Sequence, residues 1–183
     1  NKKKIKKIPK KIKLINCVGG GSSAYGFWSE FIDHDKKQIE LIGVEAGGPK
    51  GSKLHAAPLS HGAKLGILHG AAAYVCQNTE GQINETESIS AGLDYPGVSP
   101  IHCFLKDTKR ARYTSATDEE ALKAYQLVTK LEKIKPSLEP SHAFAEAIKI
   151  APKLNKNTII IVNSCGDAKK DKDILKSRLG KIK

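Results

Sequence analysis

Three consecutive glycines followed by two serines are the residues of this chain whose types and spacing most clearly suit ligand chemistry. They lie in CVGGGSSAYG, residues 17–26, between an apolar run at 13–18 and a segment with helical spacing of apolar residues at 22–34. Glycine loses much backbone entropy on folding, so three in succession indicate that bare backbone is needed there. A turn from a strand into a helix presents free amide groups at the positive end of the helix dipole, and both favour a phosphate.

Three interpretations of this loop remain open on residue types alone. Gly19-x-Gly21-x-x-Ala24 matches a loose dinucleotide fingerprint, and Glu45 ends the next apolar run, where an acid that binds a ribose would lie. A single compact phosphate, such as that of pyridoxal phosphate, suits the glycines and serines at least as well. The third alternative is a tight turn that serves only helix–strand packing.

The surrounding pattern predicts an α/β protein with a mostly parallel sheet covered by helices. A strand at 13–18, a helix at 22–34 and a strand at 39–45 form a βαβ unit, which implies parallel pairing. The β-branched run at 157–163 predicts a buried parallel strand, and a charged helix follows it.

The middle of the chain predicts shorter elements. The stretch GAKLGILHGAA, 62–72, predicts a short helix interrupted by glycine, and the turn Thr79-Glu80-Gly81 predicts a hairpin. The remaining elements are a strand at 111–117, a helix from the capping-box residues Thr117 to Glu120 as far as about 134, and a helix at 142–154 capped by Ser141.

Length and charge predict one domain with basic ends. We expect a basic, disordered lead-in at 1–12, an α/β domain at 13–176 and a basic tail at 177–183. The net charge of +12 is concentrated at the ends, because residues 1–13 carry eight lysines and no acid, whereas acids and bases balance over 14–166. This distribution does not favour nucleic-acid binding. No apolar run has the length of a membrane helix and no secretory signal is visible, so we expect a soluble, cytoplasmic protein without membrane contact.

The four cysteines lie far apart and form no CxxC pair, which argues against a zinc site. In an intracellular chain they are expected to be thiols. Cys17, Cys76 and Cys103 are expected to be small buried apolar residues, whereas Cys165 lies in a polar loop after a strand.

The order of several motifs along the chain carries a family resemblance. These motifs are CVGGGSSA, GVEAGG, HAAPLSHG, GQINETESISAGLDYPGVSP, LEPSHAFAEA and IIVNSCGD. Together they resemble the beta subunit of tryptophan synthase over roughly residues 12–175. The resemblance implies the larger C-terminal domain of a fold-type-II pyridoxal-phosphate enzyme, with a three-layer twisted sheet and helices on both faces. It also implies a lyase that replaces the hydroxyl of L-serine with indole to give L-tryptophan.

The resemblance implies a role for each matching residue. The cofactor phosphate would be cradled by Gly19, Gly20, Gly21, Ser22 and Ser23, although the family usually has Asn at the last position. Glu139, expected just before a helix cap, would lie beside the cofactor ring, and Cys165 stands where the family has a serine that binds the pyridine nitrogen. Asp94 matches an acid used in closing the active site. The backbone carbonyls of Gly19, Tyr95 and Gly97 match a site for K⁺ or Na⁺. His61 and His142 are expected to be structural.

Parts of the family site have no counterpart in this sequence. In the family, the lysine that forms the Schiff base lies upstream of the glycine loop in a His-Lys-Asn-like motif, and nothing like it occurs here. The loop after Cys165 is also longer, by about two residues. We therefore expect the C-terminal part of the enzyme without its N-terminal domain, inactive alone, and associating with that domain or as a homodimer, with an alpha subunit as a further partner. The alternatives are a catalytically silent protein that binds a phosphate ligand or a partner and, third, a dinucleotide-binding domain.

Overall fold

Four parallel strands form the central sheet of the computed structural model, which describes residues 11–180. In spatial order they are β5 (Ala111–Ala116), β2 (Ile39–Ala46), β1 (Lys11–Cys17) and β6 (Thr158–Val162). Of the expected lead-in at 1–12, residues 1–10 lie outside the described part, and Lys11 and Ile12 open β1. Residues 181–183 of the expected tail also lie outside it, while α5 (Lys172–Leu179) covers its beginning.

The strand registers bring the functional loops to one edge of the sheet. Strand β1 pairs with β2 from Ile12↔Ile39 to Cys17↔Val44, and with β6 from Lys11↔Thr158 to Ile15↔Val162. Because all these strands are parallel, their carboxyl ends meet at the same edge. The glycine loop leaves β1 there, and the loop that contains Cys165 leaves β6 beside it.

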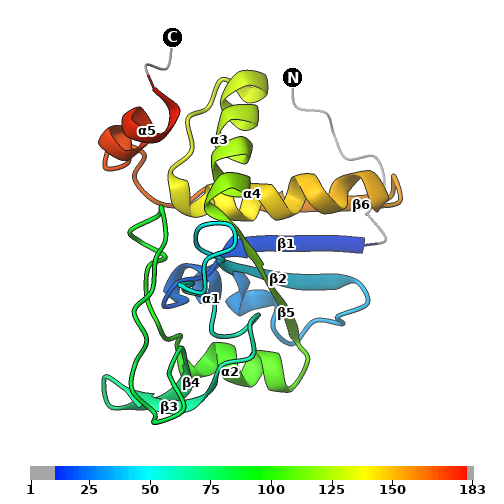
Figure 1. The fold of residues 1–183 in the computed structure, drawn as a ribbon. Helices are drawn as coiled ribbons and strands as arrows, with labels where there is room; N and C mark the ends of the chain where they lie inside the picture. The colour runs from blue at the N-terminus through cyan, green and yellow to red at the C-terminus, as the bar shows by residue number, and fades with distance from the viewer. Residues whose placement is uncertain (1–10, 181–183) are drawn as a thin grey trace.

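Helices cover both faces of the sheet (Figure 1). Helix α1 (Ser22–Trp28), the short η1 (Ser29–Phe31) and α2 (Pro100–Asp107) lie on one face, and α3 (Asp118–Glu132) and α4 (Leu138–Ile150) lie on the other. Neighbouring residues in a strand point to opposite faces. Leu14 accordingly belongs to the core beneath α1 and α2, and Ile15 to the core beneath α3 and α4. Both central strands therefore have apolar residues at consecutive positions, Leu14-Ile15 and Leu41-Ile42. The predicted α/β class with a mostly parallel sheet is confirmed.

The helix predicted at 62–72 is wrong. Strands β3 (Lys64–Leu68) and β4 (Ala71–Val75) form an antiparallel hairpin there. Its turn is His69-Gly70, both with positive φ (51° and 76°), the conformation that joins two strands tightly. Short apolar runs fit a strand or a helix equally well, and here the turn residues decide. The hairpin predicted around 79–81 is reduced to one isolated bridge, between Gln77 and Ile83.

Three further predictions near the site need correction. Helix α4 begins at Leu138 with Ser137 at its N-cap, so the predicted cap, Ser141, lies inside the helix and donates from Oγ to the Ser137 carbonyl at 2.7 Å. Pro140 fits this first turn because amides there need no helical partner. Glu139 thus lies within the first turn of α4 rather than before the helix. Strand β6 is only half-buried instead of buried, because it is an outer strand of the sheet.

Other sequence signals are confirmed. Thr117 caps α3 through a complete capping box, in which the Glu120 amide donates to Thr117 Oγ1 and the Thr117 amide to Glu120 Oε2. Helix α4 continues into η2 (Ala151–Lys153). Among the described residues, no helix has both the length and the apolar character needed to cross a membrane.

Candidate functional site

The glycine loop between β1 and α1 is held by contacts that account for two of its three glycines. A Cβ on Gly19 would lie 2.7 Å from the Gly92 carbonyl, and a Cβ on Gly21 would overlap the imidazole of His102. Gly21 also has a φ of 99°. Its carbonyl accepts a hydrogen bond from His102 Nε2 at 2.7 Å. Gly20 has neither constraint, since a Cβ there would meet nothing within 4 Å and its φ lies outside the left-handed region. Packing therefore explains Gly19 and Gly21 but not Gly20.

The backbone amides of this loop are available to a ligand. Within the described part of the chain, the N–H groups of residues 19–24 donate to no backbone or side-chain acceptor. They surround the start of α1, where the helix dipole adds partial positive charge. Ser22 and Ser23 are both exposed. Ser23 Oγ accepts from the side-chain amides of Asn16 at 3.2 Å and Asn163 at 3.3 Å, so its own proton remains to be donated.

Glu139, the next residue of the site, lies in the first turn of α4. It is 6% exposed. Its Oε1 is paired with the ammonium of Lys170, whereas Oε2 is buried and has no hydrogen-bond partner among the described residues. Burial is the largest single influence on the pKa of Glu139 and raises it. The hydrogen bonds from Lys170, the Glu139 amide and Ser137, together with the charge of Lys170, outweigh burial, and the pKa is lowered overall. The unpartnered oxygen is a polar group that a ligand could satisfy.

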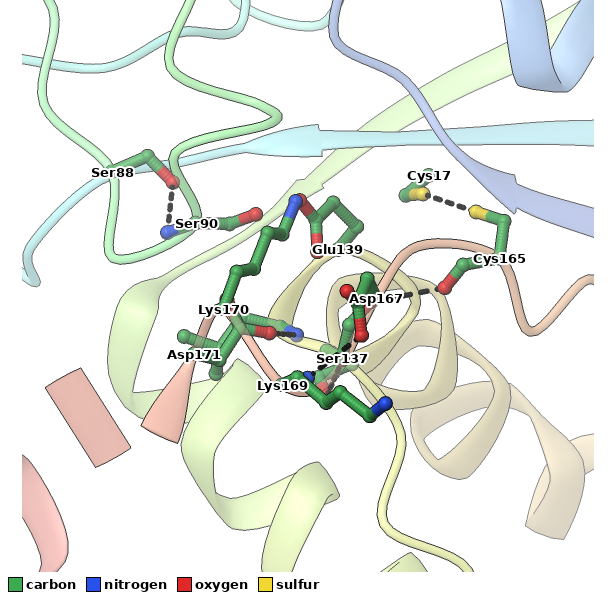
Figure 2. A network of polar contacts seen from close by, with 12 residues as sticks. Cys17, Ser88, Ser90, Ser137, Glu139, Cys165, Asp167, Lys169, Lys170 and Asp171 are labelled. Carbon is green, nitrogen blue, oxygen red and sulfur yellow. Dashed lines mark hydrogen bonds and ion pairs between the residues drawn. The ribbon is translucent and has the colours of Figure 1, made fainter. Parts of the chain in front are cut away.

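Lys170 is a residue of this site that the sequence did not point to. Figure 2 shows its side chain reaching from the loop after β6 to Glu139. The lysine belongs to the charged run CGDAKKDKD, 165–173, and in sequence it looks like a solvated residue. The Glu139 carboxylate raises the pKa of Lys170, which is therefore an ammonium at neutral pH and not a free amine.

Cys165 and Cys17 face each other at the end of β1 (Figure 2, upper right), with 3.5 Å between their Sγ atoms. Cys17 is buried and Cys165 half-buried. The hydrogen bond from Cys17 lowers the pKa of Cys165 to about 6 despite its burial. The same hydrogen bond, followed by burial, raises the pKa of Cys17 well above its usual range. Cys165 is thus the more acidic thiol of the pair.

The residues expected at the cation site are only partly brought together. Tyr95, Gly97 and Gly20 line a cavity of about 320 Å³, but Gly19 does not line it. Asp94 is exposed, and its carboxylate makes no hydrogen bond within the described part of the chain. No cluster of three or more His, Cys, Asp or Glu residues suited to a metal occurs among the residues that the structure describes.

Glu45 has a structural environment that disfavours the dinucleotide interpretation. It is 1% exposed, and both of its carboxylate oxygens accept hydrogen bonds, from the Leu59 amide at 3.0 Å and the Ser60 amide and hydroxyl at 2.7 Å. Burial raises the pKa of Glu45 to about 7. A carboxylate so enclosed has no free oxygen for the hydroxyls of a ribose.

The expected structural histidines differ in environment. His142 is fully buried in α4, with Nδ1 2.8 Å from the Leu138 carbonyl. His61 is exposed, with Nε2 3.0 Å from Ser115 Oγ. The three cysteines that were expected to be buried are buried: Cys17, Cys76 and Cys103.

Comparison with solved structures defines the class of fold. The chain resembles a fungal L-serine ammonia-lyase from Rhizomucor miehei with a TM-score of 0.57 and 19% identity, over 91% of this chain and 50% of that one. At this identity the likeness concerns the fold alone, and it confirms the predicted architecture of fold-type-II pyridoxal-phosphate enzymes.

Comparison with curated sequences is more specific. A tryptophan synthase beta chain from Chromobacterium violaceum is 50% identical over 159 residues, which are 86% of this chain and 39% of that protein. The tryptophan synthase beta chain of Fusobacterium nucleatum subsp. nucleatum is 54% identical over 160 residues, 86% of this chain and 40% of that protein. No protein-family model matches the chain. The chain is therefore a homologue of part of a tryptophan synthase beta chain, as its motifs predict, and spans about two-fifths of the length of these relatives.

Proposed function

We propose that this chain binds pyridoxal phosphate through its glycine loop, as its share of a tryptophan synthase beta enzyme. The observation that carries the proposal is Gly20. Neither packing nor backbone conformation requires glycine at this position. In our proposal, glycine is present because a side chain there would hinder the approach of a ligand to the free amides of the loop. A phosphate bound by these amides at the start of α1 gives glycine a reason to be present.

The residues around the loop fit the rest of this cofactor. Ser22 and Ser23 would add hydroxyl donors to the phosphate. Cys165 would hold the pyridine nitrogen, and the unpartnered oxygen of Glu139 would lie at the side of the ring. Pyridoxal phosphate supplies an electron sink for changes of bonding at an amino acid.

The chain's own groups prepare this site in two ways. The pair Glu139–Lys170 keeps a buried carboxylate ionised beside the ring position. The hydrogen bond from Cys17 lowers the pKa of Cys165 to about 6, and in its thiolate form Cys165 would accept a hydrogen bond instead of donating one.

The full reaction needs more than this chain, in our proposal. The lysine that would carry the cofactor, and the segment that would bind the substrate carboxylate, belong to the remaining part of the enzyme. That part would complete a lyase that joins L-serine and indole to give L-tryptophan. The proposal also includes a K⁺ or Na⁺ ion near Tyr95 and Gly97, and closure of the active site that involves Asp94. It further includes a homodimer, an alpha subunit as a partner and a cytoplasmic location.

A binding experiment tests the cofactor. We expect the chain to bind pyridoxal phosphate more tightly than pyridoxal in equilibrium dialysis. Gly20→Asp should weaken the binding at least about tenfold, because a carboxylate about 4 Å from a phosphate repels it by about 4 kcal/mol at an effective dielectric constant of ~20, before further screening. Gly26→Asp is the matched control, since Gly26 is also exposed and a Cβ there also meets nothing within 4 Å. Equal affinities for both compounds would refute the proposal.

A complementation assay tests the reaction and the second candidate, a silent phosphate-binding protein. The chain is combined with the segment of the Fusobacterium nucleatum beta chain that lies outside the matching 160 residues. The proposal predicts tryptophan formation from L-serine and indole only in the mixture. Binding of pyridoxal phosphate without any such activity would favour the silent protein.

A further inference from the structure

Two thiols from distant parts of the sequence meet at the edge of the sheet. Cys17 ends β1 and Cys165 follows β6, its neighbouring strand, and their Sγ atoms are 3.5 Å apart. A disulfide has an S–S length of about 2.05 Å, so closure of the pair requires an approach of about 1.5 Å. The other two cysteines have no cysteine partner: Cys76 contacts His55, and Cys103 contacts the Ser99 carbonyl.

We propose that Cys165 is a site of oxidation by hydroperoxides and that Cys17 resolves it to a reversible intramolecular disulfide. Cys165 is the more accessible of the two, being half-buried, whereas Cys17 is 4% exposed. A small oxidant therefore reaches Cys165 first. Cys17 is placed to react with the product because no other cysteine lies beside Cys165.

The chemistry balances with the hydroperoxide as the only oxidant. The Cys165 thiolate attacks one peroxide oxygen; the O–O bond breaks, the sulfur becomes a sulfenic acid, and the other oxygen leaves as water after taking up a proton. The Cys17 sulfur then attacks the Cys165 sulfur, the S–O bond breaks, and the hydroxyl leaves as a second water with the thiol proton. Two thiols and one hydrogen peroxide thus give one disulfide and two waters.

The backbone around Cys165 is held in place, so we expect the disulfide to form by movement of the Cys165 side chain. Ser137 Oγ donates to the Cys165 carbonyl at 3.0 Å and so holds the loop against the start of α4. Gly166 follows with a φ of 84°, and a Cβ there would overlap Ser137 Oγ. Because the main chain is fixed on both sides, rotation of the Cys165 side chain is the movement that brings the sulfurs together.

The consequence for the cofactor rests on the proposed function. A disulfide would take the Cys165 sulfur out of reach of the pyridine nitrogen. We expect oxidation to weaken binding of pyridoxal phosphate about tenfold or more, the effect of losing one charged hydrogen bond. The formation of the disulfide itself does not depend on the cofactor, so the two proposals can fail separately.

Mass spectrometry tests the disulfide on the full 183-residue chain without cofactor. After treatment with hydrogen peroxide in small excess and trypsin, we expect one linked species that joins peptides 14–36 and 157–169, and that dithiothreitol separates. Cys76 and Cys103 share peptide 65–106 and are the internal control, which should remain reduced. Equal oxidation of that peptide, or oxidation of Cys165 without linkage to Cys17, would overturn the proposal.

Variants add a second test. Cys17→Ala should convert the linked product into a Cys165 sulfenic acid, trapped with dimedone, whereas Cys165→Ser should leave Cys17 reduced under the same treatment. Oxidation of Cys17 in the Cys165→Ser variant, at the rate seen in the unsubstituted chain, would contradict the assignment of Cys165 as the site attacked first.

Discussion

Substitution of Gly21 by alanine should destabilise the chain strongly, whereas the same change at Gly20 should not. Two costs add at Gly21. An L-residue at its φ of 99° costs roughly 1–2 kcal/mol, and displacing the fully buried ring of His102 costs roughly 1–3 kcal/mol. We therefore expect Gly21→Ala to lower the free energy of unfolding by about 2–5 kcal/mol.

Gly20→Ala is the matched control, because its Cβ enters open space and its φ is not left-handed. Alanine there restricts the unfolded chain, so the free energy of unfolding should stay the same or rise by less than about 1 kcal/mol.

Urea unfolding followed by the fluorescence of Trp28 measures both variants. Trp28 is the only tryptophan in the chain, is fully buried, and its ring lies 5.7 Å from that of His102, centroid to centroid. With a slope of about 2 kcal/mol per molar urea, Gly21→Ala should lower the midpoint by about 1–2.5 M. The reasoning is refuted if the two variants unfold at the same urea concentration.

Three further predictions concern single side chains. Burial raises the pKa of Glu45 from its usual range to about 7, so the folded state holds this proton more tightly than the unfolded state and the group's contribution to stability falls as pH rises from about 4.5 to 7. Glu45→Gln should remove this dependence of stability on pH, which urea unfolding at pH 5 and pH 7.5 measures. The prediction is contradicted if the midpoint changes between the two pH values by the same amount in the variant and in the unsubstituted chain. Thr117→Ala should cost about 1 kcal/mol by removing the cap of α3, measured by thermal unfolding, and a change in melting temperature of under about 1 °C would argue against the capping box. Lys170→Met should lower the stability at pH 7 by about 1 kcal/mol, allowing for solvent screening. This loss should shrink as the pH falls through the lowered pKa of Glu139, because a protonated carboxyl no longer pairs with the ammonium. Lys169→Met, which removes no ion pair found within residues 11–180, is its control, and an equal loss in both variants would count against the pair.

Local signals in the sequence predicted the elements whose chemistry is local. The capping box at Thr117 and the β-branched strand at 158–162 depend on neighbouring residues and were found. The helix predicted at 62–72 failed because the turn at His69-Gly70, with both residues at positive φ, is not evident from apolar spacing. Ser141 failed as a cap because Leu138, Glu139 and Pro140 extend the helix by one turn.

The glycine loop could be predicted as a candidate phosphate site from residue types, but its ligand could not. The choice of pyridoxal phosphate came from the family resemblance, which also supplied Glu139 and Cys165. The role of Glu45 as a buried carboxyl, and the pairing of Lys170 with Glu139, depend on contacts between distant segments. No spacing in the sequence records such contacts, and the same is true of the approach of Cys17 to Cys165.

The central claim, that the amides around Gly20 hold the phosphate of the cofactor, is tested most directly by the ³¹P resonance of pyridoxal phosphate. We predict that this resonance shifts and broadens on addition of the chain or of its Gly26→Asp variant, and remains that of the free compound with Gly20→Asp. An unchanged resonance with the unsubstituted chain, or the same shift with Gly20→Asp, would contradict the account.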